Sequence, residues 1–278
     1  MKILYIAGLA HSGSTYLSRV LNQHSDILSV GEIVFLPKSI SGPINCPCTE
    51  NSDSNCSLWP EVLERCSIDD QKARQIARLS MDRRLEWIKA VLGLYSKQNV
   101  NSFGSRNLEF FRTISEVSGS EVILDASKTI WRVLPLWKSL PEHVYLLHLV
   151  KMPENQLESR MRMGYNFWHS LLLKYARKNT LYEWFFSNHS TYKQVRFEDL
   201  VNHPESTIEA IHHWINLDYE NPFDGAHKPF HHLQGNAQAK GSMESLRPLK
   251  EKLVTHRDYT PMQQRALSYV KQQLYPKD

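Results

Sequence analysis

The chain has 278 residues, 41% of them hydrophobic, and a formal net charge of +4. This length and hydrophobic content suit a large domain with its own core rather than a disordered chain or a small disulfide-bonded module. The small charge does not predict nucleic-acid binding, and no apolar run reaches the ~20 residues of a membrane-spanning helix. No repeat or low-complexity linker divides the chain, so we expect one domain over residues 1–278.

Short segments rich in Val, Ile and Leu predict buried parallel strands at 2–8, 27–30, 121–125, 143–150 and 191–196. Helical periodicity lies between and after them, at 14–23, 81–98, 130–138, 153–163, 166–186, 204–215 and 261–274. The alternation predicts an α/β, P-loop-like three-layer fold in which helices flank a central parallel sheet. Ligands of such sheets bind beyond the carboxyl ends of the strands.

A loop of small residues joins the first predicted strand to the first predicted helix. Gly8 and Gly13 stand five residues apart, as in a P-loop, but Ser14 takes the place of the P-loop lysine. Backbone N–H groups at a helix N-terminus bind anions, and the hydroxyls of Ser12, Ser14 and Thr15 add donors. The loop therefore predicts a phosphate or sulfate site that does not hydrolyse a triphosphate. The alternative is an ordinary turn with Ser/Thr capping.

Two lysines follow later strands of the predicted sheet. Lys128 comes soon after the strand at 121–125, and Lys151 directly after the strand at 143–150. Because the carboxyl ends of parallel strands lie at one edge, we expect both lysines beside the loop at His11. The alternative is that each is a lysine in solvent.

All four cysteines lie within one short segment, at Cys46, Cys48, Cys56 and Cys66. Their spacing matches no standard zinc finger, so we expect free thiols in a reducing cytoplasm and no metal. A structural zinc is the alternative, since thiolates cluster at zinc sites. The apolar run after Lys2 is too short for a signal peptide and leads straight into the loop, which also favours a cytoplasmic protein.

These motifs, in this order, resemble those of the sulfotransferases that use 3′-phosphoadenosine 5′-phosphosulfate (PAPS). The run from His11 to Tyr16 is similar to their first motif, a basic residue followed by Ser-Gly-Thr/Ser-Thr and an aromatic or leucine. Lys151, a proline turn and Ser159 resemble their second motif, which usually begins with arginine. The run from Asp125 to Lys128 is similar to the Asp-x-Ser-Lys segment of many bacterial members.

Two later segments add to the resemblance. VRFEDLVNHPEST, which contains Phe197, is close to their Arg-Tyr/Phe-Glu-Asp-Leu element, and Gly235-Asn236 resembles the start of their Gly-Asn-Pro-x-Arg loop. The arginine of that loop is absent, because Ala239 stands in its place, and Lys240 is the expected substitute. The resemblance implies PAPS as cosubstrate, bound by Ser12, Gly13, Ser14, Thr15, Tyr16, Lys151, Ser159, Phe197, Gly235, Asn236 and Lys240.

The resemblance also implies the catalytic groups. Glu32 follows Gly31, as the catalytic Glu does in members acting on sugars and tyrosine, and is the expected general base. His11 and Lys128 are expected to stabilise the charge on the leaving phosphate. A surface role is the alternative for Glu32 and Lys128. His24, His148, His169 and His189 are weaker candidates for the base.

Two segments are expected to surround the acceptor, a Cys-rich insert at 42–66 and a helical lid at 81–118, with the aromatic segment 164–186 beside them. The expected acceptor is a small molecule, sulfated at a hydroxyl or at a nitrogen. Nucleic acid and membrane are not expected as partners, and a homodimer is left open. A P-loop small-molecule kinase and a non-catalytic nucleotide-binding protein are the competing functions.

Overall fold

The structure, a computed structural model, describes residues 1–41, 46–49, 56–79, 93–165, 167–224, 228–233 and 259–275. Five strands form one parallel sheet in the order β2-β3-β1-β4-β5. Their bounds are β1 Lys2–Gly8, β2 Ile27–Gly31, β3 Val122–Asp125, β4 Val144–Val150 and β5 Tyr192–Arg196. The predicted strands and the parallel sheet are confirmed, and each predicted boundary is within one residue of the observed one.

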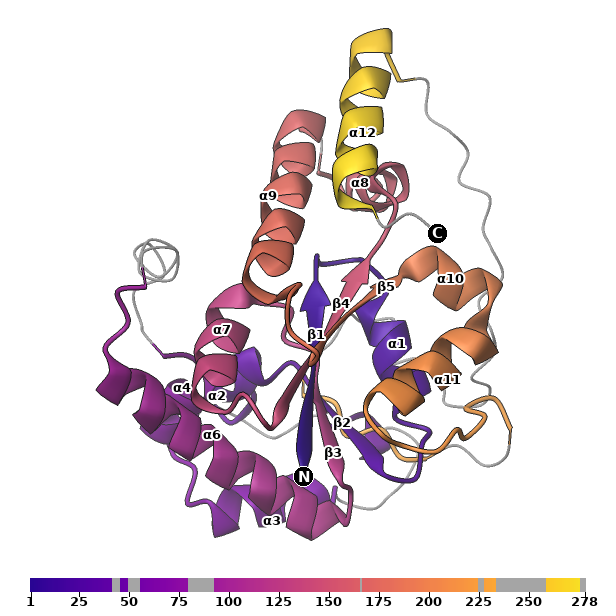
Figure 1. The fold of residues 1–278 in the computed structure, drawn as a ribbon. Helices are drawn as coiled ribbons and strands as arrows, with labels where there is room; N and C mark the ends of the chain where they lie inside the picture. Colours follow the sequence, from indigo (N-terminus) through magenta and orange to yellow (C-terminus); the bar gives the residue numbers. More distant parts are fainter. Residues whose placement is uncertain are drawn as a thin grey trace.

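Helices cover both faces of the sheet (Figure 1). One face carries α1 (Ser14–Leu21), α10 (Phe197–Asn202) and α11 (Pro204–Trp214). The other carries α2 (Leu36–Ser39), α3 (Leu58–Arg65), α4 (Asp70–Ala77), α6 (Lys97–Ser118) and α7 (Ile130–Ser139). Alternate residues of β1 divide between the two cores: Ile3 and Tyr5 pack with α6 and α7, whereas Leu4 and Ile6 pack with α1 and α11. The predicted three layers are therefore present.

Three helices extend the molecule beyond the carboxyl end of β4 (Figure 1). They are α8 (Pro153–Met161), α9 (Trp168–Phe186) and α12 (Pro261–Leu274), which pack together through Leu157, Leu171 and Leu267. The far end of α9 enters the main core through Tyr182 and Phe186. This packing places α8 and α9 over the edge of the sheet at which the sequence predicts ligand binding.

The predicted helix at 81–98 is wrong over 93–96, which are not helical, and residues 80–92 lie outside the described part. The long helix of this region is α6, which begins at Lys97. Its Phe103, Phe110 and Phe111 are buried in the core rather than lining a pocket. Gly104 allows the close approach to α7, because a Cβ there would lie 2.4 Å from the Ser139 side chain. The two 3-10 turns are η1 (Ile33–Phe35) and η2 (Pro47–Thr49).

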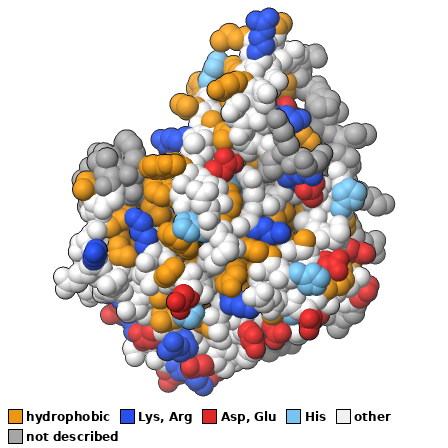
Figure 2. Space-filling model, viewed as in Figure 1, with side chains coloured by type: hydrophobic (Ala, Val, Ile, Leu, Met, Phe, Trp, Pro, Cys, Tyr) orange, Lys and Arg blue, Asp and Glu red, His pale blue; other side chains and the backbone are white. Residues whose placement is uncertain are grey.

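Acidic side chains gather along the lower edge of the view in Figure 2, around the amino ends of the strands. Hydrophobic side chains gather over α7 in the same view. Exposed aromatic residues flank or belong to α9, with Phe167 80% exposed and Trp184 61% exposed. Among the described residues, no helix combines the length and the hydrophobicity that crossing a bilayer requires.

Candidate active site

The sheet order brings the predicted site residues to one edge. Along the carboxyl ends, Glu32 follows β2, Lys128 follows β3, the loop of His11 follows β1, Lys151 follows β4, and Phe197 follows β5. The register makes β1 and β4 end together, because Gly8 pairs with Leu149. β1 and β4 also form the switch point of the topology, since the chain runs from β1 toward β3 and β2 on one side and to β4 and β5 on the other.

Glycines shape the loop after β1. Gly8 has φ 146°, and a Cβ there would lie 2.7 Å from the carbonyl oxygen of Leu149. Gly13, the N-cap of α1, has φ 93°, and its Cβ would lie 2.2 Å from the Phe197 ring. Only glycine suits these conformations and close approaches. The Ser12 hydroxyl is buried in this loop and has no hydrogen-bond partner among the described residues.

Phe197 links the loop to Lys151. The Lys151 ammonium lies 4.5 Å from the centroid of the ring that packs on Gly13, and burial lowers the pKa of this lysine. The phenol of Tyr175 donates a hydrogen bond of 2.8 Å to the Lys151 carbonyl oxygen. The two regions that the sequence assigns to the cosubstrate are therefore in contact through one aromatic side chain.

Cations converge on His11. Its φ of 68° is unusual for a residue other than glycine. Burial lowers the pKa of the His11 imidazole, and the nearby positive charges of Arg160, Lys128 and Lys151 lower it further. Like charges brought close together are unfavourable, so this arrangement favours binding of an anion.

Arg160, within α8, joins this cluster. It is only 7% exposed, and its guanidinium carbon lies 4.2 Å from the Tyr165 ring centroid. Its Nε is buried with no partner among the described residues. On the same helix, the Gln156 amide donates to the Ala10 carbonyl oxygen at 2.8 Å and so ties α8 to the loop. The position of Arg160 directly after Ser159 in the second motif was the signal in the sequence that could have placed this arginine in the site.

Glu32 and Lys128 form an ion pair at the β2 and β3 end of the site. The Lys128 ammonium donates to Glu32 Oε1 at 2.5 Å, and each side chain is 13% exposed. Burial raises the pKa of the Glu32 carboxyl, while the Lys128 charge and hydrogen bond act in the opposite direction. A raised pKa makes a carboxylate a better proton acceptor, which suits Glu32 to the role of a general base.

Comparison with solved structures identifies the fold. The sulfotransferase domain from the curacin biosynthetic pathway is 20% identical, with 99% of this chain and 98% of that chain covered and a TM-score of 0.57. The sulfotransferase domain from the Synechococcus PCC 7002 olefin synthase is 16% identical, with 100% and 96% covered and a TM-score of 0.61. The chain has the sulfotransferase fold. No family model and no curated protein matches its sequence.

Lys178, which the sequence did not single out, also lies at this edge of the sheet, beside Lys128. Its ammonium donates to the Lys128 carbonyl oxygen at 2.7 Å, and the Tyr182 phenol donates to the same oxygen at 3.0 Å. Burial, and then the Lys128 charge, lower the pKa of Lys178 to about 7. These two bonds hold Lys128 in its left-handed conformation, with φ 57°.

Asp125 does not pair with Lys128. One carboxylate oxygen accepts from the backbone and hydroxyl of Ser127, at 2.9 and 2.5 Å. The other lies 2.7 Å from Arg132 Nε, and both side chains of this ion pair are buried. Ser127 in turn accepts the Val34 N–H at 3.0 Å. Asp125 therefore fixes the turn that carries Lys128 and has no direct contact with its charge.

Glu198 has a structural role. Its carboxylate accepts from the Met152 N–H at 3.1 Å, the Asn155 amide at 2.9 Å and the Tyr275 phenol at 2.8 Å, and so caps α8. Arg196 and Asp199 pair with each other at 2.7 Å. His148 is a buried strand residue bonded to the Tyr192 phenol and the Asn179 amide oxygen, at 2.7 and 3.0 Å.

The remaining predicted cosubstrate residues divide into two groups. Ser14, Thr15 and Tyr16 form the first turn of α1, and Ser159 lies within α8. Gly235, Asn236 and Lys240 lie outside the described residues. Their predicted contacts with the cosubstrate stay predictions.

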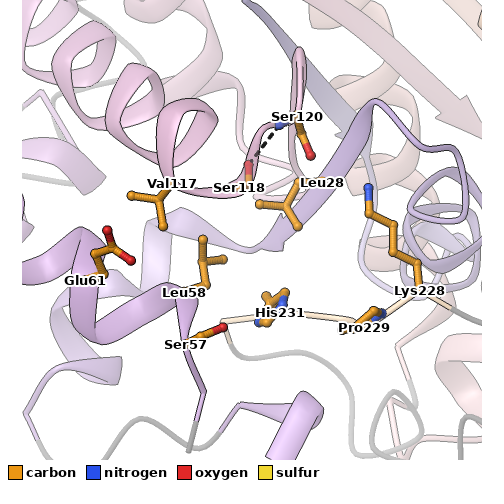
Figure 3. Close-up of a pocket in the computed structure, with 10 residues that line it drawn as sticks. All are labelled: Leu28, Ser57, Leu58, Glu61, Val117, Ser118, Ser120, Lys228, Pro229 and His231. Atoms are coloured by element: carbon orange, nitrogen blue, oxygen red, sulfur yellow. Dashed lines mark hydrogen bonds between the residues drawn. The ribbon is translucent and has the colours of Figure 1, made fainter.

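Two cavities are described. One of ≈ 180 Å³ adjoins Lys128 and is lined by Thr129, Ile130, Trp131, Lys174, Arg177, Lys178 and Leu181. The other, of ≈ 300 Å³, lies between α3, the end of α6 and the segment 228–231 (Figure 3). Leu28 lines this second cavity from near the start of β2, and none of the predicted site residues borders it. Of these two cavities, the one beside Lys128 adjoins the candidate site.

Proposed function

We propose that the protein transfers a sulfuryl group from PAPS to a small-molecule acceptor. The observation that carries this proposal is the convergence of His11, Lys128, Lys151 and Arg160 on a glycine-containing loop at a helix N-terminus. The buried Ser12 hydroxyl and Arg160 Nε, both without partners among the described residues, supply further donors that an anion would satisfy. This donor set suits a ligand that carries both phosphate and sulfate.

Lys151 and the loop that follows β1 would hold the phosphates of the cosubstrate. Phe197, which contacts both, would fix their relative position. Lys151 and Ser159 would bind the 3′-phosphate, where lysine provides a point charge but not the fork of an arginine. Arg160 comes from the same helix as Ser159, and we assign it to the same anion. Gly235, Asn236 and Lys240 would close over the phosphates.

In the transfer, the acceptor oxygen attacks sulfur as the bond between sulfur and the phosphate oxygen breaks. The acceptor proton passes to Glu32, and the product 3′-phosphoadenosine 5′-phosphate (PAP) leaves with the electron pair of the broken bond. His11 and Lys128 would stabilise the negative charge that grows on this phosphate oxygen. Lys128 lies beside both Glu32 and His11, so it would also separate the acceptor side from the cosubstrate side of the site.

The test has a binding stage and a transfer stage. Thermal shift should show stabilisation by PAP and not by ATP, because the loop lacks the lysine that a kinase needs on the β- and γ-phosphates. Transfer of labelled sulfate from PAPS should then be measured over a panel of phenols, alcohols, amines and sugars. Activity that Glu32→Gln removes while PAP still binds supports the proposal.

Glu116→Gln is the matched control, because Glu116 is an exposed carboxylate on α6. Stabilisation by ATP and phosphate transfer would instead favour the kinase. PAP binding with no transfer to any acceptor would favour a non-catalytic binding protein on the same fold.

A further inference from the structure

Three thiols and one imidazole converge away from the candidate active site. Cys46 Sγ lies 3.1 Å from Cys48 Sγ and 3.7 Å from Nδ1 of His231. Cys56 Sγ lies 3.4 Å from the same nitrogen. All four ligand atoms lie within 4.8 Å of one another, and the side chains of Cys46 and Cys56 are buried.

We propose that Cys46, Cys48, Cys56 and His231 bind one structural Zn²⁺ ion. Tetrahedral zinc with bonds of about 2.3 Å to sulfur and about 2.0 Å to nitrogen separates its ligand atoms by roughly 3.5 to 3.8 Å. The measured separations bracket this range, so small side-chain rotations complete the tetrahedron. Three cysteines and one histidine are a common set of structural zinc ligands. Four protein ligands leave no position open for a substrate, so the role is structural.

This proposal replaces the expectation of free thiols, and it differs from a zinc site made of the four cysteines alone. Cys66, the fourth cysteine of the segment, is buried elsewhere and does not belong to the cluster. Its place is taken by His231, which is far away in the sequence. The ring nitrogen of His231 faces two thiols, an arrangement that a metal ion explains and that a cysteine-only network does not.

A disulfide is the competing explanation for the close pair of sulfurs. The distance of 3.1 Å between Cys46 and Cys48 exceeds the ~2.05 Å of a disulfide bond. A disulfide between Cys46 and Cys48 would also leave the contact of Cys56 with His231 unexplained. No disulfide joins the cysteines in the described part of the chain, which leaves their sulfur atoms able to bind a metal.

The metal would brace the backbone of the proposed catalytic base. Two residues after His231, Leu233 donates its N–H to the Val30 carbonyl oxygen at 3.0 Å and accepts the Glu32 N–H at 3.1 Å. A Cβ on Gly31 would lie 2.6 Å from the Leu233 nitrogen, so glycine allows this approach. Zinc would thus fasten the Cys-rich segment to the strand end that carries Glu32.

Neighbouring groups hold His231 in place and leave the cluster accessible. The Trp59 indole donates to the His231 carbonyl oxygen at 3.3 Å, and this tryptophan is fully buried. His231 lines the cavity of ≈ 300 Å³ in Figure 3, and Cys48 is only partly buried. These features give metal and chelator a route to the ligands.

The test is metal analysis of the whole chain, expressed in zinc-supplemented medium and purified without chelator or affinity metal. We expect one zinc per chain, bound in wild type and in Cys66→Ser, and strongly reduced in His231→Ala and Cys56→Ser. Cobalt substitution should give the intense d–d absorption of a tetrahedral thiolate site, and the His231→Ala spectrum should differ from it. The bound metal should protect Cys46, Cys48 and Cys56 of unreduced protein from alkylation until chelator is added, and mass analysis detects the modified cysteines.

Wild-type protein with far less than one metal per chain that takes up no Co²⁺ would overturn the proposal. A disulfide between Cys46 and Cys48 in freshly purified protein would do the same, as would equal zinc content in wild type and His231→Ala. If the variants fail to fold, the cobalt spectrum and alkylation of wild type still decide. None of these measurements depends on sulfuryl transfer, so either proposal can fail without the other.

Hydrogen exchange tests the bracing role separately. On removal of zinc, we expect the amides of Leu233 and Glu32 to lose protection, while β1 and β4 keep theirs. Unchanged exchange at Leu233 and Glu32 in metal-free protein would show that the ion does not brace this strand end.

Discussion

Lys128 and Glu32 lie on neighbouring strand ends and share a hydrogen bond of 2.5 Å that is largely shielded from water. Burial raises the pKa of Glu32, and the lysine limits that rise. Lys128 therefore favours the unprotonated form of Glu32. A ligand that draws the Lys128 ammonium away would make Glu32 a stronger base at the moment when a base is required.

Substitution of Lys128 should move the pH dependence of the reaction. Glu32 must be unprotonated to accept a proton, so activity should fall as pH drops through its pKa. In Lys128→Met the largest influence that lowers that pKa is lost while burial still raises it, so the acidic limb of kcat/KM should shift to higher pH. A pH profile measures this shift. Lys138→Met, which removes an exposed lysine of α7, should leave the profile in place. An unmoved acidic limb in Lys128→Met contradicts the coupling.

Glu32→Gln should lower kcat by roughly 10²- to 10⁴-fold, the usual contribution of a general base. The amide keeps the size of the side chain, so PAP affinity should stay within a few-fold of wild type. Steady-state kinetics and calorimetry with PAP measure the two quantities. An equal loss of affinity and of kcat would assign Glu32 to binding rather than to proton transfer.

Binding of PAP should be linked to uptake of a proton by His11. Its pKa lies below the ordinary value because of burial and neighbouring cations, whereas a bound dianion raises it. Affinity should therefore decrease as pH rises through the window between these two pKa values. Calorimetry in buffers of different ionisation enthalpy counts the protons, and His11→Gln should abolish the uptake.

The same linkage predicts that turnover falls at alkaline pH. His11→Lys should remove that decline, because lysine stays protonated over this range. An alkaline limb that is identical in wild type and His11→Lys would refute the role of the His11 proton.

The sequence predicted the sheet well because β1 to β4 are short, mostly apolar runs that lie in the core, whereas β5 is polar and only partly buried. It also predicted the edge at which Lys128, Lys151 and the loop of His11 meet, since this follows from parallel strands alone. It missed α6 as a separate helix, although Val100, Phe103 and Phe110 repeat with helical spacing. The polar residues at the start of α6 obscure that repeat in the sequence.

Contacts between distant segments were harder to predict. Nothing local indicates that Phe197 packs on Gly13, that Lys178 bonds to Lys128, or that His231 faces the cysteines of another segment. These relationships depend on how the strands and helices pack, and spacing along one segment does not encode them. The burial of Arg160 could not be predicted for the same reason, because it comes from the packing of α8 against the loop and α9.

Arg160 and Arg162 offer a matched comparison on one helix. Arg160 is buried, and its Nε has no hydrogen-bond partner in the described part of the chain, whereas the Arg162 side chain is 55% exposed and pairs with Glu158 at 3.3 Å. A charge-assisted hydrogen bond contributes about 1.5 to 3 kcal/mol, so Arg160→Met should weaken PAP binding by roughly 10- to 100-fold. Arg162→Met should change it by less than about threefold. Calorimetry gives both values, and equal effects would place Arg160 outside the anion site.

The buried pair of Asp125 and Arg132 should dominate the stability of the turn that carries Lys128. Arg132 also donates to the Asn107 amide oxygen at 3.0 Å and to the Ile76 carbonyl oxygen at 2.5 Å, so Asp125→Asn leaves an uncompensated cation within this network. Removal of one partner of a buried pair costs about 3 to 5 kcal/mol of the free energy of unfolding. Denaturation by urea measures it. Arg65→Met breaks the exposed pair with Glu61 and should cost less than about 1 kcal/mol. If the two variants lose equal stability, the Asp125 pair is not a principal support of the fold.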